Sequence, residues 1–88
     1  MSKPVKNLQR LKAALDEGYE IRQIDGEDVL YRDLGNGLDI EISCAAVPWK
    51  RVNIYLWKDK SHILSVAERV KQDCIAEAIE GLIAEALQ

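Results

Sequence analysis

The chain has 88 residues, of which 48% are hydrophobic and 31% charged, and its formal net charge at pH 7 is −3. This size suits a single domain spanning residues 1–88, with one hydrophobic core and no room for a separate functional domain. No window is apolar over the length that crossing a bilayer requires, and no apolar run follows the N-terminal Met1-Ser2-Lys3-Pro4. We therefore expect a cytoplasmic protein that does not enter a membrane.

The first predicted element is an N-terminal helix. Its apolar residues recur at helical spacing, at Val5, Leu8, Leu11 and Leu15. Ser2 is a candidate N-cap, Pro4 lies in the first turn, and Gly18 is a typical residue to end the helix.

Three short runs with strand character follow, at residues 19–24, 29–34 and 38–44. They are separated by Asp25-Gly26 and by Gly35-Asn36-Gly37, whose residues accept the positive φ that tight hairpin turns require. The third run alternates, with Leu38, Ile40 and Ile42 on one face and Asp39, Glu41 and Ser43 on the other. This pattern predicts a strand with one core face and one acidic, solvated face.

The stretch from Trp49 to Lys60 contains three of the five aromatic residues and four cations. Its alternation predicts a strand that places Val52, Ile54 and Leu56 on one face and Arg51, Asn53, Tyr55 and Trp57 on the other. Tyr and Trp tolerate half-burial and dominate binding hot spots. We therefore predict a partner-binding surface formed by Trp49, Arg51, Tyr55, Trp57 and Lys58. If this strand pairs with residues 38–44, Asp39 and Glu41 share a face with Arg51, Tyr55 and Trp57.

A long C-terminal helix is predicted from Ser65, which forms a capping-box spacing with Glu68, to Leu87, although Ser61 is an alternative cap. Its apolar residues form one stripe at Val66, Ala67, Val70 and Cys74 and a second at Ile75, Ile79, Leu82, Ile83 and Ala86. One flat sheet cannot cover both stripes. Either the first helix covers the second stripe, or the helix bends near Asp73, or Ile75, Ile79, Leu82 and Ile83 form a self-association or partner surface.

Together these elements predict an α+β fold with an N-terminal helix, a three- to four-stranded antiparallel meander and a long C-terminal helix packed on one sheet face. This order is similar to that of double-stranded RNA-binding domains, which implies that Arg51, Tyr55, Trp57, Lys58 and Lys60 could contact a nucleic acid. Such domains carry a lysine cluster at the start of the last helix, whereas residues 63–88 hold two cations and five anions.

No catalytic, cofactor or metal motif is evident. His62 has no nucleophile or second ligand in its sequence context, and Gly35-Asn36-Gly37 lacks the lysine of a phosphate loop. Cys44 and Cys74 lie at no metal or redox spacing, so we expect two reduced, buried thiols, with a single bridge or a reactive thiol as alternatives. The sequence therefore predicts no enzyme activity, no cofactor and no bound metal.

Charge is segregated along the chain. Residues 19–48 hold two cations and seven anions, and residues 49–62 hold four cations and one anion. Pairing of the acidic hairpins with the basic strand would mix these charges in part. We predict a protein-binding module, such as an inhibitor, adaptor or regulatory subunit. The alternatives are a nucleic-acid-binding domain and a homodimeric structural or accessory protein, of the kind that phages and mobile elements encode.

Overall fold

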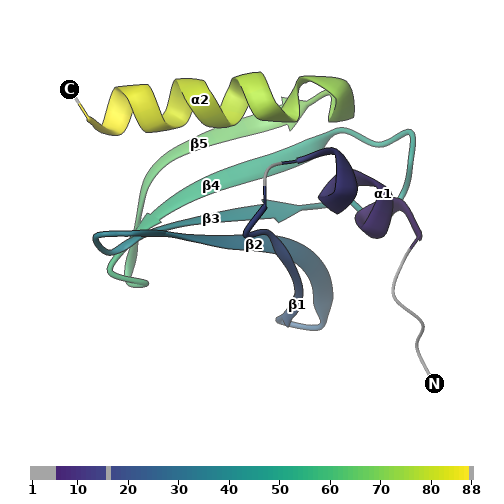
Figure 1. Cartoon of the computed structure of the whole chain (residues 1–88), viewed down its shortest axis with the longest axis horizontal. Coiled ribbons are helices and arrows are strands. Elements are labelled where there is room, and N and C mark those ends of the chain that lie inside the picture. Colours follow the sequence, from purple (N-terminus) through teal and green to yellow (C-terminus); the bar gives the residue numbers. More distant parts are fainter. Residues whose placement is uncertain (1–5, 16, 88) are drawn as a thin grey trace.

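The computed structural model of the chain describes residues 6–15 and 17–87 (Figure 1). Its elements are α1 (Lys6–Ala14), β1 (Glu20–Ile24), β2 (Glu27–Gly35), β3 (Leu38–Ser43), β4 (Val52–Lys58), β5 (His62–Val70), the short 3₁₀ helix η1 (Gln72–Cys74) and α2 (Ile75–Ala86). The predicted α+β order, from the N-terminal helix to a C-terminal helix packed on the sheet, is confirmed, but the sheet has five strands rather than three or four. The predicted N-cap Ser2 and first-turn Pro4 lie outside the described residues.

The sheet is an antiparallel meander in which each strand pairs with its neighbour in sequence, in the order β1-β2-β3-β4-β5. The two predicted turns are where the sequence places them. Asp25 and Gly26 have φ of 52° and 79°, and Asn36 and Gly37 have φ of 54° and 79°. Two consecutive residues with positive φ match the twist of flanking strands, so these turns set the registers of β1 with β2 and of β2 with β3.

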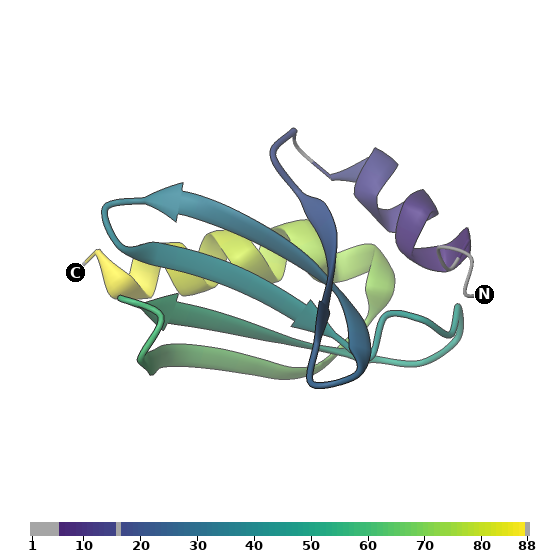
Figure 2. The same cartoon turned by 90° about the horizontal axis from the view of Figure 1, so that it is seen from below.

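Both helices pack on the same face of the sheet and enclose one core with it. Seen from the opposite side, the strands lie in front of α2 and no helix crosses them (Figure 2). The core combines side chains from α1, the sheet and α2, among them Leu8, Leu11, Leu30, Ile40, Ile42, Val52, Ile54, Leu56, Ile75, Ile79 and Leu82. We call the helix-free side the open face. Among the described residues, no helix combines the length and the apolar character that crossing a bilayer needs.

The fifth strand corrects the prediction of a helix beginning at Ser65. Residues 62–70 form β5, and α2 begins only at Ile75. The register of β5 against β4 shifts twice, once beside Leu56 and Trp57 and once between Val52 and Ile54. Each bulge adds a residue and breaks the period-two alternation of a strand. The apolar residues of β5 therefore fall at spacings that imitate a helix.

Because α2 is shorter than predicted, it has only the second of the two predicted apolar stripes, and most of that stripe is buried. Ile75, Ile79 and Leu82 are 2%, 7% and 5% exposed, and Ile83 is packed against the same core. Ile75, Ile79 and Leu82 are thus covered by the chain's own sheet, whereas Ile83 is only partly buried and lines a surface hollow. Neither thiol forms a disulfide, but Cys44 is exposed and Cys74 is only partly buried, so the expectation of buried thiols is wrong.

Candidate binding surface on the open face of the sheet

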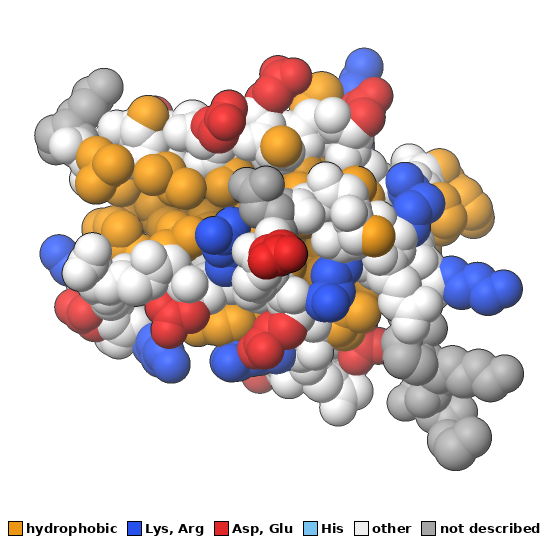
Figure 3. All heavy atoms as spheres, in the orientation of Figure 1, with side chains coloured by type: hydrophobic (Ala, Val, Ile, Leu, Met, Phe, Trp, Pro, Cys, Tyr) orange, Lys and Arg blue, Asp and Glu red, His pale blue; other side chains and the backbone are white. Residues whose placement is uncertain are grey.

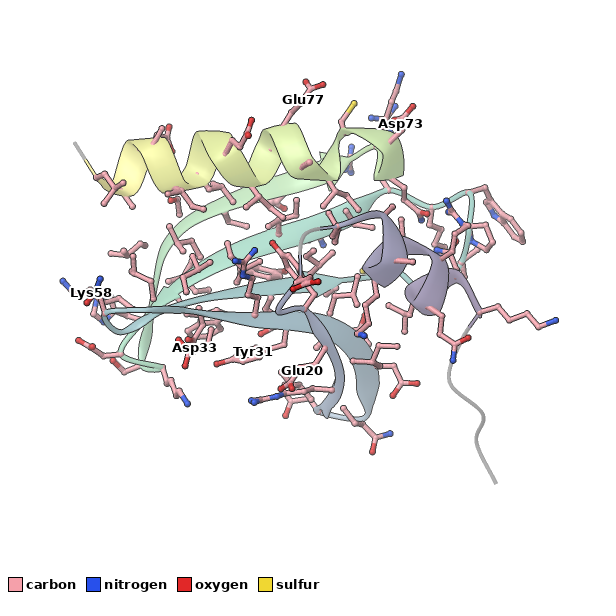
Figure 4. The ribbon with its side chains drawn as sticks, viewed as in Figure 1. Glu20, Tyr31, Asp33, Lys58, Asp73 and Glu77 are labelled. Carbon is pink, nitrogen blue, oxygen red and sulfur yellow. The ribbon has the colours of Figure 1, made fainter. Side chains whose placement is uncertain are left out.

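Register places the side chains of the open face in cross-strand rows. One row runs from β1 to β5 through Glu20, Tyr31, Glu41, Tyr55 and Val66. The next row runs from β2 to β5 through Asp33, Asp39, Trp57 and Ile63. In Figure 4, the labelled Glu20, Tyr31 and Asp33 lie on the side of the sheet away from α2. The half contributed by β1–β3 is therefore rich in acidic groups, whereas the half contributed by β4 and β5 is aromatic and apolar.

The alternation predicted for the aromatic strand is confirmed. Val52, Ile54 and Leu56 are fully buried, whereas Tyr55 and Trp57 are partly exposed on the open face. Glu41 pairs with Tyr55 and Asp39 pairs with Trp57, so these carboxylates share the aromatic face as expected. The acidic side of β3 is less solvated than predicted, since Asp39 is 4% exposed and Ser43 is also buried.

The other predicted partner-binding residues lie elsewhere. Trp49 is 83% exposed in the loop between β3 and β4. Arg51 precedes β4, and its Nη1 donates a hydrogen bond to the backbone carbonyl of Arg69 at 3.2 Å. Lys58 ends β4 in register with Leu38 and lies one position out of phase with Trp57. Trp49 and Arg51 therefore lie outside β4, and of the five residues Tyr55 and Trp57 are the two that β4 itself places on the open face.

A cavity of about 240 Å³ lies on the open face. Its lining includes Arg22, Tyr31, Asp39, Glu41, Trp57 and Lys60. The Arg22 guanidinium lies 3.9 Å from the centre of the Tyr31 ring and also pairs with the Glu20 carboxylate. Only Trp57 and the neighbouring Lys60 come from the stretch that the sequence singled out. The contributions of β1 and β2 were missed because they depend on register across two hairpins.

Burial perturbs the ionisation of two groups in this cavity. Burial, assisted by hydrogen bonding to Asp39 and by its charge, raises the pKa of Tyr31 to about 12. Burial also raises the pKa of Glu41, and the negative charges of Glu27 and Asp25 raise it further. The Trp57 indole N–H lowers the pKa of Glu41 in part. That N–H is itself buried and finds no acceptor at hydrogen-bonding geometry among the described residues.

Two further hollows lie on the helical side. One of about 150 Å³ is lined by Leu34, Ile79 and Ile83 among others, and Figure 3 shows hydrophobic side chains exposed between α2 and the β2–β3 hairpin. Another of about 520 Å³ lies between α1 and the start of α2. The smaller hollow also has Tyr19, Arg32 and Glu80 in its lining, with the Arg32 guanidinium 5.3 Å from the centre of the Tyr19 ring. The larger one has Arg10 and Asp73 but no aromatic ring in its lining.

Within residues 6–15 and 17–87, no group of three or more His, Cys, Asp or Glu side chains is arranged to hold a metal ion. His62 is exposed, and its Nδ1 lies 3.3 Å from the Ser61 hydroxyl. Comparisons with protein-family models, curated proteins and solved structures find no match for this chain. We therefore infer function from the geometry of the open face.

Proposed function

We propose that this chain is a non-enzymatic cytoplasmic module that binds another protein through the open face of its sheet. The observation that carries the proposal is the one-sided placement of the helices, which leaves half-buried Tyr55 and Trp57 facing outward. Beside them, Ile63 and Val66 are 46% and 42% exposed. Tyr and Trp are enriched among the residues that dominate interface energetics, and a contiguous apolar surface is typical of an interaction site.

The layout of charge supports a protein partner more than a nucleic acid. Arg51 and Lys58 stand at opposite ends of β4, about 23 Å apart along the strand. Asp39 and Glu41 lie directly across from the aromatic residues that would stack on bases. A nucleic-acid surface needs clustered cations along the path of the phosphates.

The test is capture from a lysate of the native host, with nuclease treatment, by the wild-type chain and by Trp57→Ala and Val66→Glu. We expect a stoichiometric protein that resists nuclease and whose affinity falls at least fivefold in each variant, or about 1 kcal/mol for Trp57→Ala. Trp49→Ala is the matched control, because Trp49 is exposed in a loop outside the open face.

Circular dichroism of each variant separates lost binding from lost folding, and Val66→Glu changes an exposed residue of an edge strand. Full retention of the partner by both folded variants would refute the open face as the binding surface. Recovery that disappears with nuclease would instead support the nucleic-acid alternative.

A further inference from the structure

Two aspartates lie directly opposite each other on the open face. Asp33 of β2 is the register partner of Asp39 of β3, and Asp39 is 4% exposed. Like charges on directly opposed residues destabilise a strand pair, and a buried carboxylate is costly unless a cation or several hydrogen bonds compensate it. Within the described part of the chain, the ion pair formed by Arg22 and Glu20 is the only one within 4 Å. Neither aspartate therefore has a cation of the described residues within 4 Å, and Tyr31 supplies a hydrogen bond to Asp39.

The surroundings of Asp39 add a second carboxylate and two aromatic rings. Glu41 follows on the same face of β3, about 6.6 Å further along the strand. Tyr31 and Trp57 line the same 240 Å³ cavity from the strands on either side. The contact between Arg22 and Tyr31 demonstrates that a guanidinium fits against a ring of this face.

We propose that this cavity receives an arginine side chain of the partner protein, whose guanidinium pairs with Asp39 and Glu41 and lies against Trp57. The proposal deepens the proposed function and rests on it. A planar guanidinium offers five N–H donors, bridges separated carboxylates and stacks on aromatic faces. A lysine ammonium is a point charge that meets fewer of these groups at once. Two cations, Arg22 and Lys60, also line the cavity, but Arg22 already pairs with Glu20. Asp39 and Glu41 therefore outnumber the remaining lining cation, which makes the site complementary to an incoming cation.

The direct test uses Trp49→Phe, in which Trp57 is the only remaining tryptophan. N-acetyl-arginine amide is titrated into this protein while the backbone and indole N–H signals are followed by NMR. We expect saturable shifts confined to Trp57, Asp39, Glu41 and their neighbours. N-acetyl-lysine amide should bind more weakly, and the neutral isostere N-acetyl-citrulline amide and an equal ionic strength of sodium chloride should produce no such shifts.

Asp39→Asn and Glu41→Gln should each weaken arginine binding at least fivefold, whereas Glu77→Gln on the outer surface of α2 should not change it. The proposal would be overturned if citrulline reproduced the shifts, if the shifts spread over the whole chain, or if both carboxylate variants retained them. So would the absence of any shift at the cavity.

The two proposals fail in distinguishable ways. In one outcome, Trp57→Ala loses the partner while the folded Asp39→Asn and Glu41→Gln variants bind it with unchanged affinity. This result would refute the arginine site but leave the open face as the binding surface. Arginine binding at the cavity, with a partner that both open-face variants still retain, would instead refute the binding face.

Discussion

Glu41 is half-buried on the open face, where desolvation and the charges of Glu27 and Asp25 raise its pKa. A carboxyl group with a higher pKa in the folded chain binds a proton more tightly there than in the unfolded chain. Its contribution to stability is complete below the unfolded-state pKa, about 4.3, and is lost as the pH rises through the folded-state pKa. At neutral pH the ionised Glu41 therefore opposes folding.

Glu41→Gln keeps the shape of the side chain and removes its charge. We expect the free energy of unfolding at pH 7 to rise in this variant, and its advantage over the wild type to disappear near pH 4. Urea unfolding followed by circular dichroism at both pH values measures the difference. Glu77→Gln, in the first turn of α2, should instead lose a small favourable interaction with the helix dipole. A Glu41→Gln variant that is less stable than the wild type at pH 7 would contradict this account.

At the scale of elements, side-chain hydrogen bonds connect α1 and the β3–β4 loop to η1. Asn7, which is 5% exposed, donates through Nδ2 to the carbonyl of Ala45 at 2.6 Å and to Oε1 of Gln72 at 3.1 Å. Gln72 donates through Nε2 to the carbonyls of Val47 and Lys50 at 2.8 and 2.7 Å. Asn7 thus satisfies the buried carbonyl of Ala45, and Gln72 binds two carbonyls of the β3–β4 loop that are partly or fully exposed, so the two side chains hold α1 and this loop together.

Asn7→Ala should lower the free energy of unfolding by about 1–3 kcal/mol, because it leaves the buried carbonyl of Ala45 without its donor. Gln72→Ala should lower it by about 1 kcal/mol, because the hydrogen bonds that it removes are partly or fully exposed. The double variant should lose less than the sum, since the two side chains are bonded to each other. Gln9→Ala, on the exposed side of α1, is the control and should change stability little. Strict additivity in urea unfolding would mean that the two residues act independently.

The strands differ in how far local sequence determines them. Leu38, Ile40 and Ile42 alternate cleanly with polar residues, and Asn36-Gly37 sets their turn, so β3 could be predicted from composition and period alone. In β5 the bulges displace Leu64 and Arg69, and Arg69 has φ of 56°. That conformation is stabilised by Asn53, whose Oδ1 accepts the Arg69 N–H at 3.1 Å. Such a contact joins residues 16 apart and leaves no local signal.

The candidate site divides in the same way. Tyr55 and Trp57 could be assigned to one face because that assignment needs only the alternation of a single strand. Tyr31 and Asp33 could not be assigned to this face from the sequence, because their position beside Glu41 and Asp39 depends on the register of a separate hairpin. The near-complete burial of Asp39 also depends on neighbouring strands rather than on its own sequence context.

For the molecule as a whole, the one-sided core decides which surfaces remain for partners. Ile79 is 7% exposed and belongs to the core that joins α1, the sheet and α2. An arrangement with both helices on one face leaves the sheet's other face as the broad surface without a helical cover. Self-association through Ile75, Ile79 and Leu82 would require α2 to detach from the sheet.

Ile79→Asp distinguishes a core role from an interface role. If Ile79 packs only within its own chain, the buried charge and lost packing should lower the free energy of unfolding by about 3 kcal/mol or more. Leu87→Asp, at a position 75% exposed, should fold normally. Circular dichroism reports folding, and sedimentation velocity reports mass. A well-folded Ile79→Asp protein of half the wild-type mass would place Ile79 at an interface and contradict the one-sided core. Unfolding without a preceding change in mass would instead leave the open face as the surface on which partner contacts should be sought.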